Sequence, residues 1–298
     1  ILAPLFHATA LYGQLLRSIY MGSTCVISHK FQAIDAMQAI ENEKINVCVA
    51  VPTIFWLMMV HGDFNKFNLS SLRRIIYGGS PASESFVRQI ASNFPEALQI
   101  NAYGLTECTS VATTLPPSKC LEKIGSIGLA VPFSEIEIID PSSHILPPGA
   151  IGELIIRGPQ VCQGYWKNTN STSSTFHGGW LHTGDLAKKD ANGFIYLMDR
   201  KKDMIIRGGE NIYSVEVENI LYNHPKVLEA AVVGVPDKIF GEQVKACIVL
   251  KRGEVSDGNE IREFCRYHLA DYKIPKFIEF LDTLPRNHAG KIMKEKLL

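Results

Sequence analysis

The residues best suited to chemistry occur in four short segments that place glycine beside a hydroxyl, aromatic or charged side chain. Tyr103 has an aromatic face that suits a purine, Gly104 lets the backbone approach a ligand closely, and Glu107 suits a hard cation. The carboxylate of Asp185 has two acceptor oxygens, as a vicinal diol requires. Singly, each segment also fits an ordinary surface turn. The four segments are Gly78-Gly79-Ser80-Pro81, Ala102-Tyr103-Gly104-Leu105-Thr106-Glu107, Thr183-Gly184-Asp185 and Gly290-Lys291-Ile292.

Strands and helices that alternate along residues 1–115 must position the first two segments. This alternation predicts a layered α/β subdomain with a mostly parallel sheet. Strands are expected at 24–28, 47–51, 74–77 and 99–102, and helices at 33–42, 53–61 and 84–93. The first residues, Ile1 to Thr9, are interpreted as a strand that runs into a functional loop.

The pattern changes after this subdomain. Residues 116–199 contain short strands, at 135–140 and 152–157, between Pro/Gly-rich turns, which predicts a β-rich, barrel-like subdomain. Residues 1–199 would thus form one large domain. A charged junction follows, and residues 200–298 predict a small, mobile α+β domain across a hinge. Its strands are expected at 230–235 and 244–250, and its helices at 215–223 and 259–268, the first capped by Ser214.

Composition excludes several functional classes. The chain carries 30 basic and 30 acidic residues, so it lacks the basic footprint of a nucleic-acid binder. Its longest apolar stretch, 47–60, contains Pro52 and is shorter than the ~20 residues that span a bilayer. The seven cysteines are scattered without Cys-x-x-Cys spacing, which favours neither a zinc site nor a disulfide framework. We therefore expect a reducing intracellular location, the cytoplasm or an organelle interior.

Taken together and in order, these segments resemble the adenylate-forming superfamily of acyl-CoA synthetases, luciferases and peptide-synthetase adenylation domains. The resemblance implies that Tyr103 lies on adenine, Thr106 bonds the α-phosphate and Glu107 holds Mg²⁺. It also implies that Ala102 and the loop Gly78-Gly79-Ser80-Pro81 run past the adenine. Asp185, together with Arg200 after the next hairpin, would bind the ribose.

The charged stretch that begins at Asp199 resembles the family's hinge and the loop that follows it. Lys202 occupies the matching hinge position, and an exposed charged run can absorb the backbone rotation that a hinge needs. Gly208 and Gly209 would line the pantetheine tunnel of coenzyme A. One departure is Ser214, where the family usually has proline; both residues suit the start of a helix.

Gly290-Lys291-Ile292 resembles the loop that carries the catalytic lysine of adenylation. Lys291 would stand between the substrate carboxylate and the α-phosphate, two anions that repel each other by roughly 4 kcal/mol at 4 Å and an effective dielectric constant of about 20. The preceding residues, Asn287-His288-Ala289, depart from the Thr or Ser that the family more often has.

The segment Pro4-Leu5-Phe6-His7 resembles the family loop between the acyl pocket and the thiol tunnel. Amino-acid-activating members usually have aspartate where His7 stands, so the sequence favours an acid without an α-amino group. Ser110 and Val111 would line the acyl pocket, and the apolar segments around them suggest a fatty chain or an aryl ring. A lone histidine among apolar residues also fits an ordinary packing role.

The resemblance implies an ATP-dependent acyl-CoA synthetase that activates a fatty or aryl acid as acyl-AMP, most like medium- or long-chain fatty-acid–CoA ligases. ATP, AMP, Mg²⁺ and coenzyme A would be its small-molecule partners, and a homodimer is left open. The alternatives are an adenylation domain that loads a carrier protein and a non-catalytic nucleotide-binding relic.

The family's Gly-rich phosphate loop is absent from this sequence, and the chain starts at Ile1 within a patterned segment. We therefore expect a piece of a longer protein. Alone, this piece would bind adenosine or acyl-AMP weakly and would catalyse adenylation inefficiently.

Overall fold

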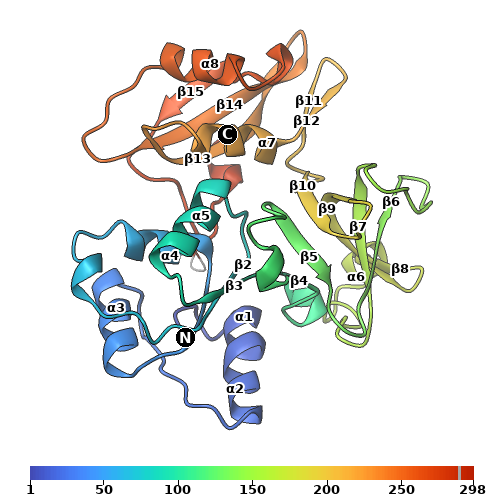
Figure 1. Cartoon of the computed structure of the whole chain (residues 1–298). Helices are drawn as coiled ribbons and strands as arrows, with labels where there is room; N and C mark the ends of the chain where they lie inside the picture. Colours follow the sequence, from blue (N-terminus) through green and yellow to red (C-terminus); the bar gives the residue numbers. More distant parts are fainter. Residues whose placement is uncertain (288–289) are drawn as a thin grey trace. The chain divides into compact units, whose positions relative to one another are not determined.

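The computed structural model describes residues 1–287 and 290–298 (Figure 1). The described chain divides into two compact units. The first comprises Ile1–Thr183 and Ala187–Leu197, and the second comprises Gly184–Leu186 and Met198–Leu298. No helix in the described ranges combines the length and apolar character needed to cross a membrane.

A parallel sheet between helices forms one part of the first unit. Its strands β1 (Val47–Ala50), β2 (Arg74–Gly78) and β3 (Leu98–Tyr103) pair in register, β1 with β2 and β2 with β3. The accompanying helices are α3 (Ala33–Asn42), α4 (Pro52–Met59) and α5 (Glu84–Asn93). Side chains from these elements share one buried apolar cluster that includes Met37, Phe55 and Ile75. The predicted α/β arrangement is confirmed.

Local sequence explains why α5 forms directly after β2. Ser83 adopts an extended conformation and its Oγ accepts a hydrogen bond from the N–H of Phe86 at 3.2 Å, which caps the helix. Glu84 places negative charge in the first turn, where the helix dipole favours it. Phe86, Val87 and Ile90 recur at helical spacing and are buried. The segment between β2 and α5 is consequently held at both ends.

Antiparallel strands extend the sheet beyond β3. They are β4 (Thr113–Leu115), β5 (Ser126–Ala130), β6 (Glu135–Ile139), β7 (Gly152–Arg157), β8 (Phe176–His177), β9 (Trp180–Lys189) and β10 (Ile195–Arg200). The strand order is β1-β2-β3-β4-β5-β10-β9-β7-β6, with β8 paired to β9. The β-rich part is therefore continuous with the parallel sheet. Short helical segments complete it: η2 (Phe64–Lys66), η3 (Thr106–Cys108), η4 (Pro117–Lys119) and α6 (Thr169–Thr175).

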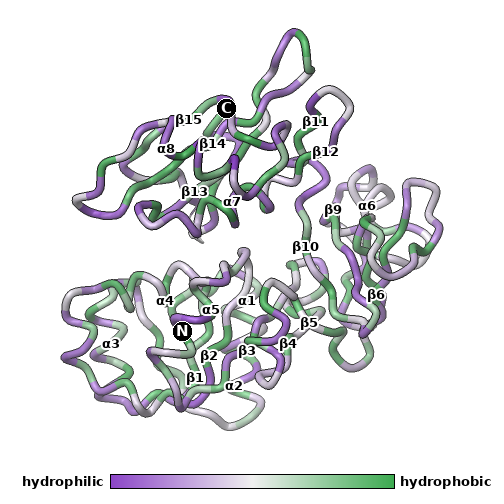
Figure 2. Tube along the Cα trace, turned by 45° about the horizontal axis from the view of Figure 1, so that its top comes forward, coloured by the Kyte–Doolittle hydropathy of each residue, from purple (hydrophilic) through white to green (hydrophobic). Residues whose placement is uncertain are grey.

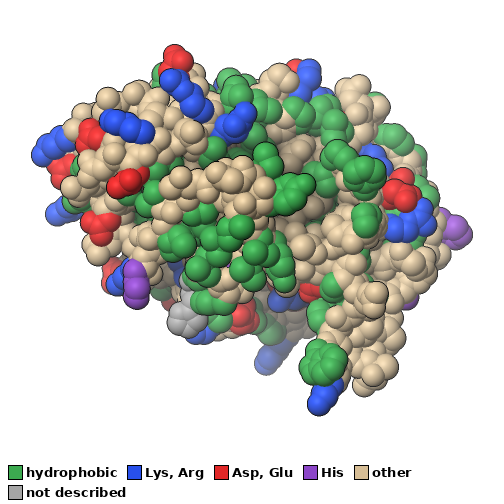
Figure 3. Space-filling model, turned by 90° about the horizontal axis from the view of Figure 1, so that it is seen from below, with side chains coloured by type: hydrophobic (Ala, Val, Ile, Leu, Met, Phe, Trp, Pro, Cys, Tyr) green, Lys and Arg blue, Asp and Glu red, His purple; other side chains and the backbone are tan. Residues whose placement is uncertain are grey.

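The beginning of the chain differs from the prediction. Residues 8–20 form a helical segment, α1 (Ala8–Ala10), the π-helical η1 (Leu11–Leu16) and α2 (Arg17–Tyr20), and the strand expected at 24–28 is not formed. His7 starts this segment, because its Nδ1 accepts a hydrogen bond from the N–H of Thr9 at 3.3 Å. Several large apolar side chains in this segment are exposed, among them Ile19 and Tyr20. Figure 3 shows apolar side chains gathered on one face of the molecule.

The second unit is built on its own sheet, in the order β12-β11-β14-β13 with β15 beside β14. The strands are β11 (Ile205–Arg207), β12 (Glu210–Ile212), β13 (Val227–Asp237), β14 (Gly241–Leu250) and β15 (Phe277–Phe280). The helices are α7 (Ser214–Tyr222), α8 (Gly258–Arg266), η5 (Asp271–Lys273) and η6 (Lys294–Lys296). Val217 and Leu221 of α7 and Ile261 of α8 pack with the strands in one cluster. Figure 2 shows the hydrophobic and hydrophilic stretches that alternate along both units.

A buried polar network joins distant segments of the second unit. Ser214 donates its N–H and its hydroxyl to the two carboxylate oxygens of Asp199, the hydroxyl at 3.0 Å. The Nζ of Lys294 donates to the Ser214 Oγ at 2.6 Å and lies 2.7 Å from the Glu218 Oε1. That oxygen also accepts the N–H of Val232 at 2.8 Å. Burial raises the pKa of the Asp199 and Glu218 carboxyls, and the Lys294 ammonium opposes this effect.

The network also corrects the predicted cap of α7. The N-cap residue is Tyr213, and Ser214 is the first helical residue. The carboxylate of Asp199 accepts the otherwise free N–H at the start of this helix, so a residue from another part of the chain supplies the cap.

Candidate active site

The carboxyl ends of β2 and β3 bring two of the predicted segments together. Gly78 pairs with Ala102 across the parallel strands. A Cβ on Gly78 would lie 1.9 Å from the Ala102 carbonyl oxygen, so only glycine fits there. Gly79 has φ +78°, which starts the turn toward Ser80 and Pro81. Residues 78–81 and 102–107 therefore leave the sheet side by side, at the edge where open α/β sheets hold ligands.

The second segment turns sharply after β3. Tyr103 pairs with Thr113 of β4 and its side chain is nearly buried in the apolar cluster of the β-rich part. Gly104 follows, and a Cβ there would lie 1.9 Å from the Ser110 carbonyl oxygen. The chain crosses itself so closely at this point that a side chain is excluded. Glycine at 104 is thus required by the loop itself.

Strained backbone lies directly after Glu107. Thr109 and Ser110 have φ of 52° and 90°, values that non-glycine residues rarely adopt. Within the turn, the Leu105 N–H donates to the Cys108 Sγ at 3.3 Å, and burial raises the pKa of that thiol. Thr106 is exposed at the start of this turn, η3. Strain of this kind persists where surrounding contacts fix the backbone, often at functional sites.

Contacts from residues 160–165 fix this loop. The Cys162 N–H donates to the Glu107 carbonyl at 2.8 Å, and the Thr109 hydroxyl donates to the Gln160 carbonyl at 2.7 Å. The Tyr165 hydroxyl donates to the Glu107 Oε1 at 2.6 Å. Among residues 1–287 and 290–298, Tyr165 is the only hydrogen-bond partner of this carboxylate. The Glu107 Oε2 is open, which fits a divalent cation.

Sequence reasoning did not identify Tyr165 as a site residue. It lies 58 positions from Glu107, outside the four glycine-containing segments. An aromatic hydroxyl beside Gly164 in a polar loop was the available signal, and it is a weak one.

In the second unit, the third predicted segment meets the charged junction. The Arg200 Nε lies 3.3 Å from the Asp185 Oδ1, and the Lys201 N–H donates to the Gly184 carbonyl at 2.8 Å. Asp185 is nearly buried, with 7% of its surface exposed. The structure thus places Asp185 and Arg200 together.

The loop that carries Lys291 is a tight turn within the same unit. The Asn287 Oδ1 accepts the Lys291 N–H at 3.0 Å, and the Asn287 N–H donates to the Lys291 carbonyl at 2.9 Å. His288 and Ala289, which belong to the predicted motif, lie outside the described residues. Asn287, which departs from the family pattern, therefore holds the turn through these two hydrogen bonds.

The charge environment of Lys291 links it to the Asp185–Arg200 pair. Its side chain is exposed, yet nearby protein displaces enough water to lower the pKa of the ammonium, and Arg200 acts in the same direction. The carboxylates of Asp185 and Asp203 oppose this decrease. The charges of Asp185 and Arg200, two other predicted site residues, therefore act on Lys291.

The predicted hinge and tunnel residues are placed by ordinary backbone geometry. Lys202 is exposed in a turn between β10 and β11. Gly208 and Gly209 connect β11 to β12 as a two-residue hairpin turn, with φ of 61° and 89°. A turn with positive φ at both positions selects glycine. The hairpin alone accounts for both glycines.

The predicted acyl-pocket residues lie in and beside the N-terminal helical segment. His7 caps α1, and Gly13 of η1 lies so close to Ser110 that a Cβ at 13 would be 3.0 Å from the Ser110 Oγ. Ser110 and Val111 are both partly buried. Gly13 and the π-helical turn around it were not foreseen from the sequence.

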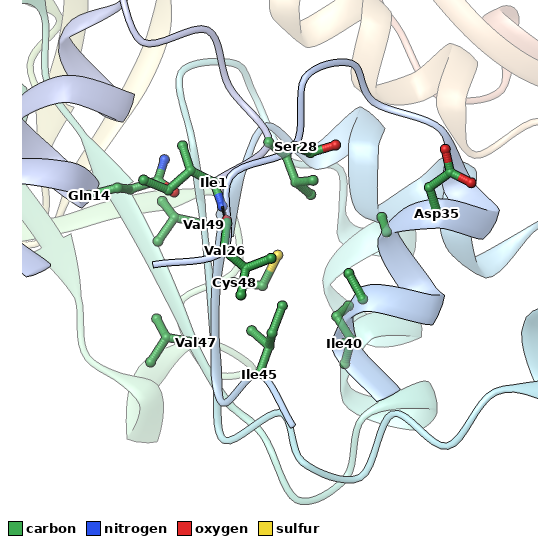
Figure 4. A pocket seen from close by; sticks show the side chains of 13 residues that line it. Ile1, Gln14, Val26, Ser28, Asp35, Ile40, Ile45, Val47, Cys48 and Val49 are labelled. Carbon is green, nitrogen blue, oxygen red and sulfur yellow. Dashed lines mark hydrogen bonds between the residues drawn. The ribbon is translucent and has the colours of Figure 1, made fainter. Parts of the chain in front are cut away.

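A separate small cavity lies between β1, α3 and the N-terminal segment. Figure 4 shows the apolar side chains around it, with Gln14 at one end and Asp35 at the other. Its volume is about 60 Å³. None of the predicted site residues lines it.

Within the described ranges, no cluster of three or more His, Cys, Asp or Glu side chains could hold a metal ion. Glu107 has one open oxygen, so a cation there would need further ligands from a bound molecule. Nucleotide phosphates are the usual source for Mg²⁺. The donor set fits a metal that arrives with a nucleotide.

Comparison with known proteins identifies the family of this chain. Residues 1–166 match the model of the AMP-binding enzyme family, and residues 216–291 match that of the AMP-binding enzyme C-terminal domain. Feruloyl-CoA synthase of Amycolatopsis sp. is 39% identical over 98% of this chain and 59% of its own length. A long-chain-fatty-acid–CoA ligase of Bacillus subtilis is 37% identical over 100% of this chain and 53% of its own length.

The fold is also similar to that of a solved structure. The o-succinylbenzoate CoA synthetase of Bacillus subtilis, in complex with its acyl-adenylate intermediate, has a TM-score of 0.89 and 35% identity. The match covers 100% of this chain and 60% of that one. The chain spans only about half to three fifths of the length of these relatives.

Proposed function

Because the chain belongs to the AMP-binding enzyme family, we propose that it acts in an ATP-dependent acyl-CoA synthetase. The enzyme would activate a fatty or aryl carboxylic acid as acyl-AMP and transfer the acyl group to coenzyme A. The observation that carries this proposal is the cluster of Asp185, Arg200 and Lys291 in one unit. In this cluster, the Asp185 carboxylate can accept hydrogen bonds from a ribose diol. The Lys291 ammonium can stand between the substrate carboxylate and the α-phosphate.

In the first step, a carboxylate oxygen of the acid attacks the α-phosphorus of ATP, and pyrophosphate leaves. The Lys291 ammonium reduces the repulsion between the two anions by a few kcal/mol, roughly 4 for one pair of unit charges at 4 Å. Burial lowers the pKa of Lys291, Arg200 acts in the same direction, and the carboxylates of Asp185 and Asp203 oppose the decrease. Asp185 accepts the ribose hydroxyls, and Arg200 keeps its carboxylate oriented.

The loop after β3 handles the rest of the nucleotide in this proposal. Thr106, exposed at the start of η3, would bond the α-phosphate, and the open Glu107 oxygen would bind the Mg²⁺ that accompanies ATP. Adenine lies between the backbone of residues 78–81 and the Ala102–Tyr103 segment. The close packing of Gly78 and Gly104 keeps that backbone accessible.

In the second step, the coenzyme A thiolate attacks the acyl carbonyl carbon and AMP leaves. We assign Lys202 as the hinge between the two arrangements of the small domain, 200–298, relative to the large one, 1–199. Gly208 and Gly209 would then border the path of the pantetheine chain. Their hairpin presents backbone without side chains, which suits a narrow thiol arm.

The acid is proposed to lack an α-amino group. His7 caps α1 through Nδ1 and brings no permanent negative charge to pair with an ammonium. Ser110 and Val111 would line the acyl end of the pocket. Both the feruloyl-CoA synthase and the long-chain-fatty-acid–CoA ligase are named for acids that fit this proposal. The scattered cysteines, without Cys-x-x-Cys spacing, are the basis for proposing a reducing compartment such as the cytoplasm or an organelle interior.

Thioester formation from a supplied acyl-adenylate tests the proposal without depending on the first step. Feruloyl-AMP, octanoyl-AMP and palmitoyl-AMP would each be mixed with the chain and coenzyme A, and acyl-CoA quantified by mass spectrometry. We expect acyl-CoA above the rate without protein. A phosphopantetheinyl carrier protein that accepts the acyl group in place of coenzyme A would favour the carrier-loading alternative, and transfer to neither would contradict the proposal.

A further inference from the structure

The loop that carries Glu107 is held from outside its own segment. Residues 160–165 supply two backbone contacts and one side-chain contact to it, and the side-chain contact falls on the carboxylate itself. The Tyr165 hydroxyl donates to one oxygen, Oε1, at 2.6 Å. This leaves Oε2 as the only oxygen of the group without a hydrogen-bond partner among the described residues.

We propose that Tyr165 is a positioning residue that occupies the Glu107 Oε1 and makes the carboxylate bind a divalent cation through Oε2 alone. The inference rests on the proposed function, because the cation is the one that accompanies ATP. Tyr165 itself touches neither cation nor nucleotide in this scheme.

The Tyr165 side chain is fixed well enough to orient a carboxylate. Its ring packs edge-on against Phe176 with centroids 5.5 Å apart. Its backbone N–H donates to the Thr172 Oγ1 at 2.9 Å, and that hydroxyl donates to the Asn168 carbonyl at 2.7 Å. Gly164 lets the chain approach Thr172, since a Cβ at 164 would lie 2.4 Å from the Thr172 Cγ2. The phenol is therefore anchored at both its ring and its backbone.

The direction of the Tyr165–Glu107 hydrogen bond follows from the two groups. A protonated hydroxyl facing a carboxylate has one favourable arrangement, in which the phenol donates and the carboxylate accepts. The carboxylate oxygen that accepts this hydrogen bond is then a poorer metal ligand than the free one.

One-oxygen binding has a consequence for metal choice. Mg²⁺ requires near-octahedral geometry with one oxygen per ligand position, whereas Ca²⁺ also accepts bidentate carboxylates. If Tyr165 blocks one oxygen, it favours Mg²⁺ over Ca²⁺. Tyr165→Phe keeps the ring on Phe176, removes the hydroxyl and frees both oxygens of Glu107.

The test measures ATP affinity of the chain by calorimetry with MgCl₂, with CaCl₂ and with EDTA. Loss of a partner that orients a metal ligand typically lowers metal affinity by about 10- to 100-fold. We expect Tyr165→Phe to weaken the Mg²⁺-supported affinity by about tenfold, to leave the EDTA value unchanged, and to lower the Mg²⁺-to-Ca²⁺ affinity ratio. A role limited to packing would move all three affinities together.

Tyr196→Phe is the matched control. Its hydroxyl interacts with a different carboxylate, that of Asp190, which is already paired with Lys123 at 2.8 Å. The Mg²⁺-to-Ca²⁺ affinity ratio of Tyr196→Phe should equal that of the unmodified chain. Thermal unfolding of both variants establishes that each is folded before binding is compared.

The outcomes separate the inference from the function on which it rests. If Mg²⁺ strengthens ATP binding in the unmodified chain and equally in Tyr165→Phe, with the same Mg²⁺-to-Ca²⁺ ratio, the role of Tyr165 is wrong and the proposed function survives. If neither cation affects ATP binding in the unmodified chain, the assignment of Glu107 fails, and the role of Tyr165 fails with it.

Discussion

Glu107 and Glu218 are two glutamates that the fold uses in opposite ways. Glu107 stands on a strained loop of the first unit, where one hydroxyl holds one of its oxygens. Glu218 lies on α7 of the second unit, is nearly buried, and binds both the Lys294 ammonium and the Val232 N–H. The first carboxylate retains an open oxygen for a ligand, whereas the second is committed to structure.

Two aspartates of the second unit also differ in their partners. Asp199 gives both oxygens to Ser214 at the start of α7, whereas Asp185 pairs with Arg200 near the Lys291 charge. The second unit therefore contains charged side chains with two different kinds of partner. The kind is decided by how completely protein groups satisfy each charge, and substitutions should separate the two.

The largest loss of stability is expected for Lys294→Met. It removes the cation beside Glu218 and leaves a buried carboxylate unpaired, which costs about 3 kcal/mol, at the low end for buried pairs because the lysine is partly exposed. Hydrogen exchange of the α7 and β13 amides measures this unit locally. The control is Lys296→Met, an exposed lysine of the same turn. Equal changes in both variants would mean that the network is not stabilising.

A smaller loss is expected for Ser214→Ala. This change removes the hydroxyl that donates to Asp199 and accepts from Lys294, at a cost of about 1–2 kcal/mol. Because the three groups form one network, the losses from Ser214→Ala and Lys294→Met should not add, and their coupling should be about 0.5–2 kcal/mol. The same exchange experiment on the double variant checks this, and simple additivity would count against a shared network.

Glu107→Gln should change stability least. Its side chain makes one surface hydrogen bond, so the free energy of unfolding should stay within about 0.5 kcal/mol. The divalent-cation dependence of ATP binding should nevertheless disappear, since an amide offers a metal no negative charge. Thermal unfolding and calorimetry together check both halves. If Glu107→Gln destabilised the chain as much as Lys294→Met, Glu107 would be a structural residue like Glu218.

The smallest effect concerns the pH dependence of Lys291. Its lowered pKa means that more of the neutral amine is present at pH 8–9 than for an ordinary lysine, so it should be acylated faster than Lys296. Arg200→Gln removes a positive neighbour and should raise this pKa, which slows labelling; Asp185→Asn should lower it further and speed labelling. Acetylation rates from peptide mass spectrometry provide the measurement. Identical pH profiles for Lys291 and Lys296 would exclude the shift.

Local sequence patterns predict much of this fold. The helices 33–42 and 84–93 have the predicted bounds, because apolar spacing and, for α5, the Ser83 cap are local signals. The segment 8–20 was missed, since its apolar residues have no single helical face and its cap is a histidine. The strand expected at 24–28 has the right composition, but β-propensity alone does not supply a pairing partner.

Only those residues of the candidate site that belong to short motifs could be predicted from the sequence. Asp185, Arg200 and Lys291 were identified from such motifs, and the structure places them near one another's charges. The bond between Tyr165 and Glu107 joins residues 58 positions apart, and that between Lys294 and Ser214 joins residues 80 apart. Contacts at this separation depend on the tertiary fold, which no local pattern encodes.

Binding of a non-hydrolysable acyl-adenylate tests the central claim most directly. The chain would be titrated with an acyl-sulfamoyl adenosine and with its 2′,3′-dideoxy form, and the same pair would be titrated into Asp185→Asn. We predict that loss of the ribose hydroxyls weakens binding by about tenfold or more in the unmodified chain, and that Asp185→Asn largely removes this difference. Equal binding of the two ligands by the unmodified chain would contradict an acyl-adenylate site built around Asp185.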